Sequence, residues 1–227
     1  MKTIKAKALV LREYEAAESD KRLLLLCKGH GRVMAYARGA RKQTSKFMAA
    51  AQVFTYSEFV LAQGSGFYSV AQADVIESFY PLRQDYDRLM AACDILETCE
   101  KTLWDNVDSD ELLLLALRAL KNLSKGMLPP QVKSVFLFRF FMFHGVQPQL
   151  DGCMVCNEAA NFLHAEGLAC EEHRSLQGLK ISEACLAAMR FIQESDLSQS
   201  FMFNASEAVL NELEKAAELL WRTHFSS

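Results

Sequence analysis

Residues 22–39, RLLLLCKGHGRVMAYARG, contain two strand-like runs around a short glycine-containing turn. The first run is apolar at successive positions, which is typical of a β-strand buried on both faces. The second run alternates small apolar side chains with larger ones: Val33, Ala35 and Ala37 against Arg32, Met34, Tyr36 and Arg38. Because alternate residues of a strand point to opposite faces, the small residues suit a barrel interior and the others its outer surface. The segment therefore predicts a hairpin of a small β-barrel.

Three more strand-like runs lie on either side of this hairpin, at residues 6–13, 51–63 and 67–79. Turn and loop sequences separate the runs, and no segment among them has the length of a helix. Five short strands in succession predict a closed or nearly closed barrel. The run at 51–63 is long and alternates imperfectly, so we expect a curved strand with a bulge.

After Pro81 the apolar residues recur at helical spacing. We expect helices over residues 82–104, 108–126, 129–145, 182–195 and 205–225. Asp108 and Asn204 are the predicted N-caps of the second and last helices, each with a glutamate three positions later. The helix over 129–145 is apolar on most faces, which predicts a place at the centre of a helical bundle. Strands followed by helices predict an α+β protein.

Positive charge is concentrated at the start of the chain, although the formal net charge is −3. Residues 1–46 contain twelve Lys and Arg against four Asp and Glu, a net charge of +8. The remaining residues contain thirteen against twenty-four, a net charge of −11. A field of one sign in one segment indicates a partner of the opposite sign.

The stretch YARGARKQTSK, residues 36–46, holds four basic side chains, and acids are absent from all of residues 21–57. Basic groups at intervals contact successive phosphates, and an aromatic ring among them can stack on a base. This pattern predicts a nucleic-acid-binding surface; the alternative is a solvated strand face with a mobile loop. The predicted contacts are Arg32, Tyr36, Arg38, Arg41, Lys42 and Lys46, with Tyr36 as the stacking residue. Further basic residues extend the patch: Lys2, Lys5, Lys7, Lys21, Arg22 and Lys28.

Four potential metal ligands occur in the spacing Cys153-x2-Cys156-x13-Cys170-x2-His173. Two pairs of such ligands on tight turns can surround one Zn²⁺ ion tetrahedrally. Since no open position then remains for a catalytic water, the sequence predicts one structural zinc. His164 is a competing ligand, and the alternative is a set of unpaired cysteines with an incidental histidine. The other cysteines lie in apolar periodic segments and are predicted core thiols: Cys27, Cys93, Cys99 and Cys185.

Motifs of other functional classes are missing from the sequence. GxxxxGK[ST], GxSxG, HExxH and GxGxxG do not occur. The acidic run at 105–111 suits a helix N-terminus better than a magnesium site. No apolar run reaches the roughly 18 residues of a membrane span, and the N-terminus is unlike a signal peptide. We therefore expect a cytoplasmic protein without a membrane partner.

Three features in this order resemble the RecO family, the bacterial recombination mediators of the RecF pathway. They are the barrel with ARGARK, the junction VIESFYPLRQDYDRL at 75–89, and the knuckle that follows GVQPQLDG at 145–152. The resemblance covers essentially the whole chain. It implies an OB-fold over residues 1–80, a helical domain over 81–149 and 179–227, and a zinc knuckle over 150–178. Zinc-bearing members usually have four cysteines, whereas this chain has His173 at the fourth position and Asn157 at a common glycine position.

The resemblance also implies a function. Family members are not enzymes: they bind single- and double-stranded DNA, anneal complementary strands and help to load recombinase on DNA covered by single-stranded DNA-binding protein (SSB). The implied partners are RecR and the acidic C-terminal tail of SSB, and the implied location is the bacterial cytoplasm at the nucleoid. Two other functions stay open: an adaptor whose basic patch binds an acidic protein, and a zinc-dependent nucleic-acid hydrolase. Salt-dependent DNA binding would distinguish the first, and a count of zinc ligands the second.

Overall fold

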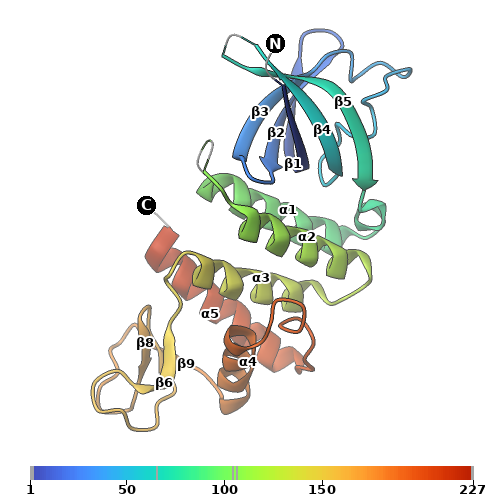
Figure 1. Ribbon diagram of the computed structural model, residues 1–227. Helices are drawn as coiled ribbons and strands as arrows, with labels where there is room; N and C mark the ends of the chain where they lie inside the picture. Colours follow the sequence, from blue (N-terminus) through green and yellow to red (C-terminus); the bar gives the residue numbers. More distant parts are fainter. Residues whose placement is uncertain (1–2, 65, 104, 106, 226–227) are drawn as a thin grey trace. The chain divides into compact units, whose positions relative to one another are not determined.

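A computed structural model describes residues 3–64, 66–103, 105 and 107–225 of the chain. It divides into two compact units, Met1–Gly126 and Met127–Ser227, and each unit is described by itself. The first unit holds a β-barrel followed by two helices, and the second holds three helices and a small sheet (Figure 1). The protein is therefore of the α+β class, as the sequence predicts.

The barrel consists of β1 (Thr3–Ala16), β2 (Asp20–Cys27), β3 (Gly31–Ala37), β4 (Tyr56–Gln63) and β5 (Tyr68–Glu77). Its strands close in the order β1-β2-β3-β5-β4, and β1 pairs back with β4. All of these pairings are antiparallel except the parallel pairing of β3 with β5. Five strands in a closed Greek-key order make an OB-like barrel, so this part of the prediction is confirmed.

The barrel interior is filled by the small residues of β3 and by apolar residues of the other strands. Val33, Ala35 and Ala37 are at most 3% exposed, which confirms the predicted interior face of β3. Residues 23–27 of β2 are all buried, as expected for a strand covered on both faces. Ala40 and Phe47, from the segment between β3 and β4, also belong to the barrel core.

The prediction for the fourth strand was partly wrong. β4 begins at Tyr56, and residues 51–54 form turns that carry Ala51 into the barrel core. The register of the β4–β5 pair does shift twice, but the extra residues lie on β5, at Ala71 and Ile76. A further shift in the β1–β2 pair places an extra residue, Leu11, on β1. Bulges of this kind increase the local bend of a strand and help a small sheet to close.

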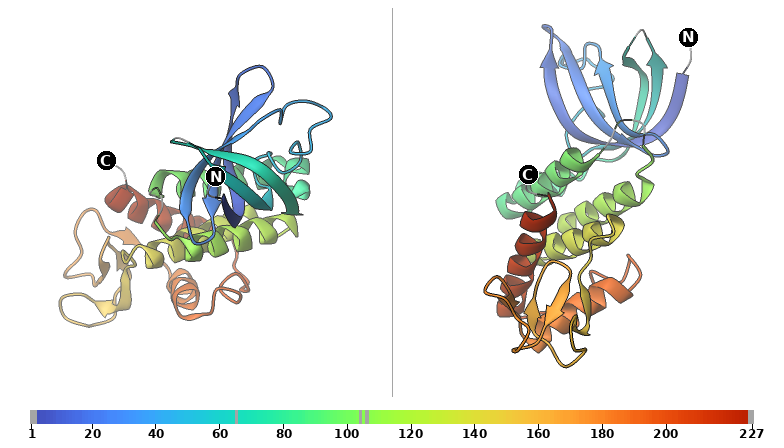
Figure 2. Two further views of the ribbon diagram at one scale, coloured as in Figure 1. Left: turned by 45° about the horizontal axis from the view of Figure 1, so that its top comes forward. Right: turned by 90° about the vertical axis from the view of Figure 1, so that its left-hand side faces the viewer.

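The barrel is followed by the short 3₁₀ helix η1 (Tyr80–Gln84), then α1 (Tyr86–Thr102) and α2 (Asp110–Ser124). α1 and α2 lie side by side beneath one end of the barrel in Figure 1 and in the right view of Figure 2. The N-cap of α1 is Asp85, whose side chain accepts a hydrogen bond from the Arg88 amide. The predicted N-cap of α2 was wrong by one residue: Ser109 is the N-cap, and the Asp108 side chain accepts from the Asp110 amide at 3.0 Å.

The second unit contains α3 (Pro129–Phe143), α4 (Glu183–Glu194) and α5 (Glu207–Phe225). α3 packs against both other helices, as expected from its apolar sequence, and its two prolines occupy the first turn. Phe140 of α3 packs against Trp221 and Phe225 of α5 at tilted angles, with ring centroids 5.8 and 5.1 Å away. The predicted cap of α5 was wrong: the Ser206 hydroxyl, and not Asn204, accepts from the third amide of the helix.

A small sheet between α3 and α4 completes the second unit. Its strands are β6 (Gln149–Cys153), β7 (Phe162–Leu163), β8 (Gly167–Ala169) and β9 (Leu179–Lys180), in the order β6-β8-β7-β9. Among the residues that the structure describes, every helix is too short or too polar to span a bilayer.

The domain boundaries expected from the sequence at 80, 149 and 178 stay a prediction.

Candidate functional site

The outer face of β3 borders a cavity of about 450 Å³ in the first unit. β2 contributes Arg22, β3 contributes Arg32 and Tyr36, and the β4–β5 hairpin contributes Phe67 and Tyr68. These residues come together because β3 lies between β2 and β5 in the barrel. The cavity thus combines aromatic rings with guanidinium groups, which are the side chains that bind unpaired nucleotides.

The aromatic part of the cavity centres on Tyr36 and Phe67. Their rings pack edge to face with centroids 5.2 Å apart, and Phe67 remains 41% exposed. The sequence identified Tyr36 but not Phe67, which follows the turn-like residues 64–66 and was assigned only to the start of a strand. A large apolar side chain directly after a glycine-rich turn was the signal that could have indicated it.

The cationic part of the cavity contains one paired and one unpaired guanidinium. Arg32 Nε donates to Asp105 Oδ1 at 2.6 Å, and this hydrogen bond lowers the pKa of Asp105 below its usual value. Arg22 stacks over the Tyr14 ring at 4.8 Å and forms no ion pair with any described residue. Asp105 was assigned from the sequence only to a helix N-terminus, whereas isolated β-bridges hold its backbone beside Gly31 and Arg32.

The segment between β3 and β4, which carries the remaining predicted contacts, is held in place at both of its ends. The Gly39 amide donates to Asp20 Oδ1 at 2.7 Å, and the Arg41 amide donates to the Ser19 carbonyl at 2.9 Å. At the far end of the segment Phe47 is buried in the barrel core. The basic segment is therefore anchored at both ends, with its charged side chains outside.

The predicted DNA contacts fall into two groups. Arg32 and Tyr36 line the cavity, whereas the others are exposed at the end of β3 and in the following segment: Arg38, Arg41, Lys42 and Lys46. Arg41 pairs with Glu15 at 3.2 Å, and Lys46 lies over the Phe47 ring at 4.9 Å. Arg38 and Lys42 have no ion-pair partner in the part of the chain that the structure describes.

The wider basic patch is less uniform than the linear sequence indicates. Lys21 pairs with Glu13 at 2.9 Å, and Lys5 pairs with Glu58 at 2.8 Å. Lys2 lies outside the described residues. Residues 21–57 contain no acid, but β1, which pairs with β2, carries Glu13 and Glu15, and β4, which pairs with β1, carries Glu58. Charge counted along the chain therefore overestimates the unpaired charge on the barrel surface.

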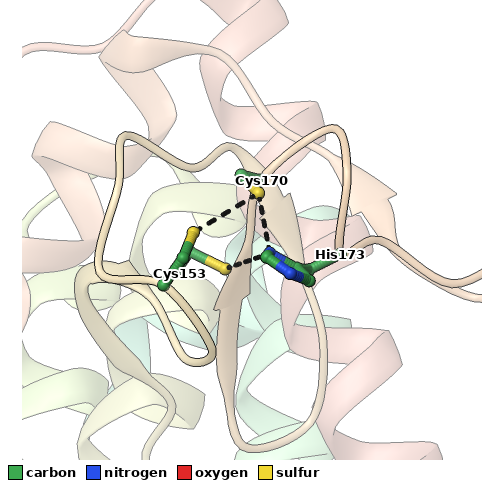
Figure 3. Close-up of side chains that lie close together, drawn as sticks. Cys153, Cys170 and His173 are labelled. Carbon is green, nitrogen blue, oxygen red and sulfur yellow. Dashed lines mark hydrogen bonds between the residues drawn. The ribbon is translucent and has the colours of Figure 1, made fainter.

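A second candidate site lies in the small sheet, where the predicted ligands converge. The ligand atoms of Cys153, Cys156, Cys170 and His173 all lie within 4.8 Å of one another, so the cluster could hold a metal ion. Figure 3 shows the side chains of Cys153, Cys170 and His173 pointing toward one another. The Cys156 and Cys170 sulfurs are 3.8 Å apart. Two thiolates on one tetrahedral zinc, each with a bond of about 2.3 Å, are separated by about 3.8 Å.

The local backbone favours the thiolate form of Cys153, which is the form that binds a metal cation. Amides of Cys156 and Val155 point at the Cys153 sulfur and lower the pKa of that thiol to about 6. A thiolate near neutral pH is the form that binds metal. Asn157 has a φ of 63°, a left-handed conformation that Asn tolerates better than most residues, so it can replace a glycine here. His164 lies outside the cluster, with its Nδ1 3.5 Å from the Ser175 hydroxyl.

The remaining cysteines divide into buried and exposed thiols. Cys27, Cys99 and Cys185 are completely buried, and burial raises the pKa of each to about 12. These three match the prediction of core thiols. Cys93 does not, because it is exposed on the outer side of α1.

Comparison with known proteins finds two matching family models. The model described as Recombination protein O N terminal matches residues 1–79, and Recombination protein O C terminal matches residues 83–226. The DNA repair protein RecO of Acetivibrio thermocellus is 34% identical to this chain over 227 residues, which covers 96% of this chain and 90% of the relative. The protein of the same name from Caldicellulosiruptor saccharolyticus is 29% identical, covering 94% and 89%.

Proposed function

The chain belongs to the RecO family of DNA repair proteins, and from this membership we propose that it is a non-enzymatic mediator of recombinational repair. In this proposal the chain binds single- and double-stranded DNA and anneals complementary strands. It also helps to load recombinase on DNA that is covered by SSB. The proposed partners are RecR and the acidic C-terminal tail of SSB, in the bacterial cytoplasm at the nucleoid.

The observation that carries the DNA-binding proposal is the aromatic and basic cavity beside β3. OB-folds use the face of their second and third strands and the loop between their fourth and fifth strands to bind oligonucleotides. Here β2 contributes Arg22, β3 contributes Arg32 and Tyr36, and the β4–β5 hairpin contributes Phe67. The anchored basic segment extends the same positive surface with Arg38, Arg41, Lys42 and Lys46. Phosphates would contact the cations, and unpaired bases would stack on the rings.

We further propose that Cys153, Cys156, Cys170 and His173 hold one structural zinc. The donor set fits, because three thiolates and one imidazole are common zinc ligands and their spacing suits a tetrahedron. Four protein ligands leave no position for a catalytic water. The zinc would stabilise the small sheet and would supply no chemistry to a substrate.

A salt series tests the DNA-binding proposal directly. We would titrate a fluorescent single-stranded oligothymidylate and a duplex at several salt concentrations, and repeat the single-strand titration with SSB present. We expect log Kd to rise linearly with log salt concentration. We also expect the protein to bind the oligothymidylate when SSB covers it. Binding to an acidic peptide in place of both DNAs would contradict the proposal and support an adaptor. DNA cleavage that depends on added zinc would support a hydrolase.

A further inference from the structure

We propose that the Asp105 carboxylate occupies the place that the phosphate of one unpaired nucleotide takes when DNA binds, so that the cavity beside β3 is a subsite closed by an internal anion. This inference rests on the proposed DNA-binding function and deepens it. It names one nucleotide as the unit bound in the cavity, Arg32 as the phosphate ligand, and Asp105 as the group displaced.

The size and walls of the cavity suit one nucleotide. Its volume of about 450 Å³ lies in the range of roughly 300–1,000 Å³ for small-molecule sites. Tyr36 and Phe67 meet edge to face, so a ring face stays available to a base. Phe67 is 41% exposed, although burial of a phenylalanine is favourable. A base that stacks there would remove this apolar surface from water.

The charges of the cavity are arranged for exchange of one anion for another. Among the described residues that line it, Arg22 and Arg32 are cationic and Asp105 alone is anionic. Arg32 is bound to Asp105 at 2.6 Å, yet the Asp105 side chain is 66% exposed and the Arg32 side chain 36% exposed. Exposed ion pairs are weak, whereas a guanidinium can bind a phosphate through two parallel hydrogen bonds. A phosphodiester that replaces Asp105 leaves the charge of the subsite balanced.

The backbone keeps Asp105 close to Arg32 whether or not the side chains are paired. Asp105 forms isolated β-bridges with Gly31 and Arg32 at the start of β3. A Cβ atom on Gly31 would collide with the Val107 carbonyl, so glycine permits this close approach. These backbone contacts hold the Asp105 carboxylate next to Arg32. The carboxylate therefore competes with phosphate for Arg32 at a high local concentration.

The subsite also predicts a preference for single strands. A base in a duplex is already stacked and paired, and it could enter the cavity only after leaving the helix. Loss of the aromatic wall should therefore reduce single-strand binding far more than duplex binding. Loss of Asp105 should change the salt dependence, because phosphate would then displace a solution anion and not an internal carboxylate.

The first test concerns the aromatic wall. Phe67→Ala is compared with Tyr86→Ala, which removes an aromatic side chain that is 74% exposed on α1, outside the cavity. We expect Phe67→Ala to weaken oligothymidylate binding by at least about fivefold, the lower limit for loss of one stacked base, with a smaller effect on duplex binding. Tyr86→Ala should leave both affinities unchanged. Equal effects of the two variants would overturn the subsite.

The second test concerns the internal anion. Asp105→Asn removes its charge, and Asp74→Asn removes the same charge from an exposed barrel residue that does not line the cavity. We expect Asp105→Asn to tighten oligothymidylate binding about two- to fivefold, which corresponds to loss of a weak competing ion pair. Its slope of log Kd against log salt should steepen, because binding then releases a solution anion from Arg32 in place of the internal carboxylate. Asp74→Asn should leave the slope unchanged.

A double-mutant cycle assigns the effect to Arg32. In an Arg32→Gln background, Asp105→Asn should no longer tighten binding, because the guanidinium for which it competes is gone. If the tightening persists in the Arg32→Gln background, the assignment to Arg32 is wrong. If Asp105→Asn alone weakens binding, the proposal is also overturned, and Asp105 serves to position Arg32 for DNA. Thermal melting of each variant controls for loss of the fold. If the unaltered protein shows no salt-dependent DNA binding, the proposed function itself fails; if it binds but both tests are negative, only the subsite fails.

Discussion

Arg38 and Arg41 have the same side chain and lie three positions apart, but their surroundings differ. Arg41 pairs with Glu15 at 3.2 Å, whereas Arg38 has no carboxylate partner among the described residues. A free guanidinium releases a counterion from DNA when it binds a phosphate, but a paired one must first lose its carboxylate. The value of a basic residue to DNA binding is therefore set by its neighbours as well as by its charge.

The unpaired basic residues should set affinity without setting sequence preference. Arg38→Ala and Lys42→Ala should each weaken binding to unrelated sequences by similar factors. Each should also reduce the slope of log Kd against log salt by about 0.9 on duplex DNA. Lys125→Ala, at the exposed C-cap of α2, is the matched control and should change neither quantity. Unchanged slopes for both test variants would move the DNA site to another surface.

Tyr36 should contribute what charge cannot. Stacking of one base on an aromatic side chain is worth about 1–3 kcal/mol, so Tyr36→Ala should weaken single-strand binding by that amount and duplex binding by less. Tyr36→Phe keeps the ring and its contact with Phe67, and it should restore most of the affinity. Both variants are measured by anisotropy titration on single and double strands. Equal losses on the two substrates would identify Tyr36 as a packing residue of the barrel surface.

At the scale of elements, β3 shows what a sequence can predict. Its alternation of small and large residues correctly separated the barrel interior from the outer face, because side-chain direction in a strand follows from position alone. The Cys and His spacing likewise predicted a cluster that the structure brings together. Both signals are local, so they needed no knowledge of the fold.

The cavity partners of β3 could not be predicted in the same way. Phe67 reaches Tyr36 only because β3 pairs with β5, and Asp105 reaches Arg32 only because the chain returns from α1 to the start of β3. Both contacts depend on the closed strand order, which periodicity does not specify. For the same reason the acids of β1 that pair with Lys21 and Arg41 were missed.

The knuckle should behave as a folding element that depends on metal. Its buried apolar side chains include Leu150, Phe162, Leu163, Leu168 and Ala169, and so small a core does not fold a loop alone. We expect one zinc per chain, and we expect Cys153→Ser to lower the melting temperature and the solubility more than the DNA affinity. His173→Cys should keep the metal, since a thiolate is an equally good fourth ligand.

Metal analysis of protein purified without chelator, followed by melting of both variants, tests this expectation. Zinc-free protein whose melting does not respond to added zinc would show that the four residues do not form a metal site. A site with three protein ligands and one water would support a hydrolase in place of a structural site.

At the scale of the whole molecule, the family models and the compact units divide the chain differently. The N-terminal model ends at residue 79, whereas the first compact unit continues to Gly126. The difference reflects contacts between the barrel and the two helices after it. Arg12 of β1 pairs with Glu100 of α1 at 2.7 Å, and the Gly29 amide donates to Asp110 of α2 at 2.6 Å. We infer that the barrel and these helices stabilise each other.

Two fragments test this inference. A fragment of residues 1–126 should unfold in one cooperative transition and bind oligothymidylate with an affinity close to that of the full chain. A fragment of residues 1–79 should melt at a lower temperature, because Leu82 and the buried face of α1 are lost with the helices. Circular dichroism melting and anisotropy titration provide the two measurements. Equal melting temperatures for the fragments would show that the barrel is independent of α1 and α2.

The pairing of β3 with β5 is much shorter than the other pairings of the barrel. It joins Ala35 to Tyr68 and Tyr36 to Ser69, whereas β2 follows β3 along its full length from Lys21 and Ala37 to Cys27 and Gly31. A seam with so few backbone hydrogen bonds should open locally at a lower free-energy cost than global unfolding. Amide hydrogens at this seam should then exchange with deuterium sooner than those of the β2–β3 pair. We expect the barrel to open first at this seam, beside Tyr36.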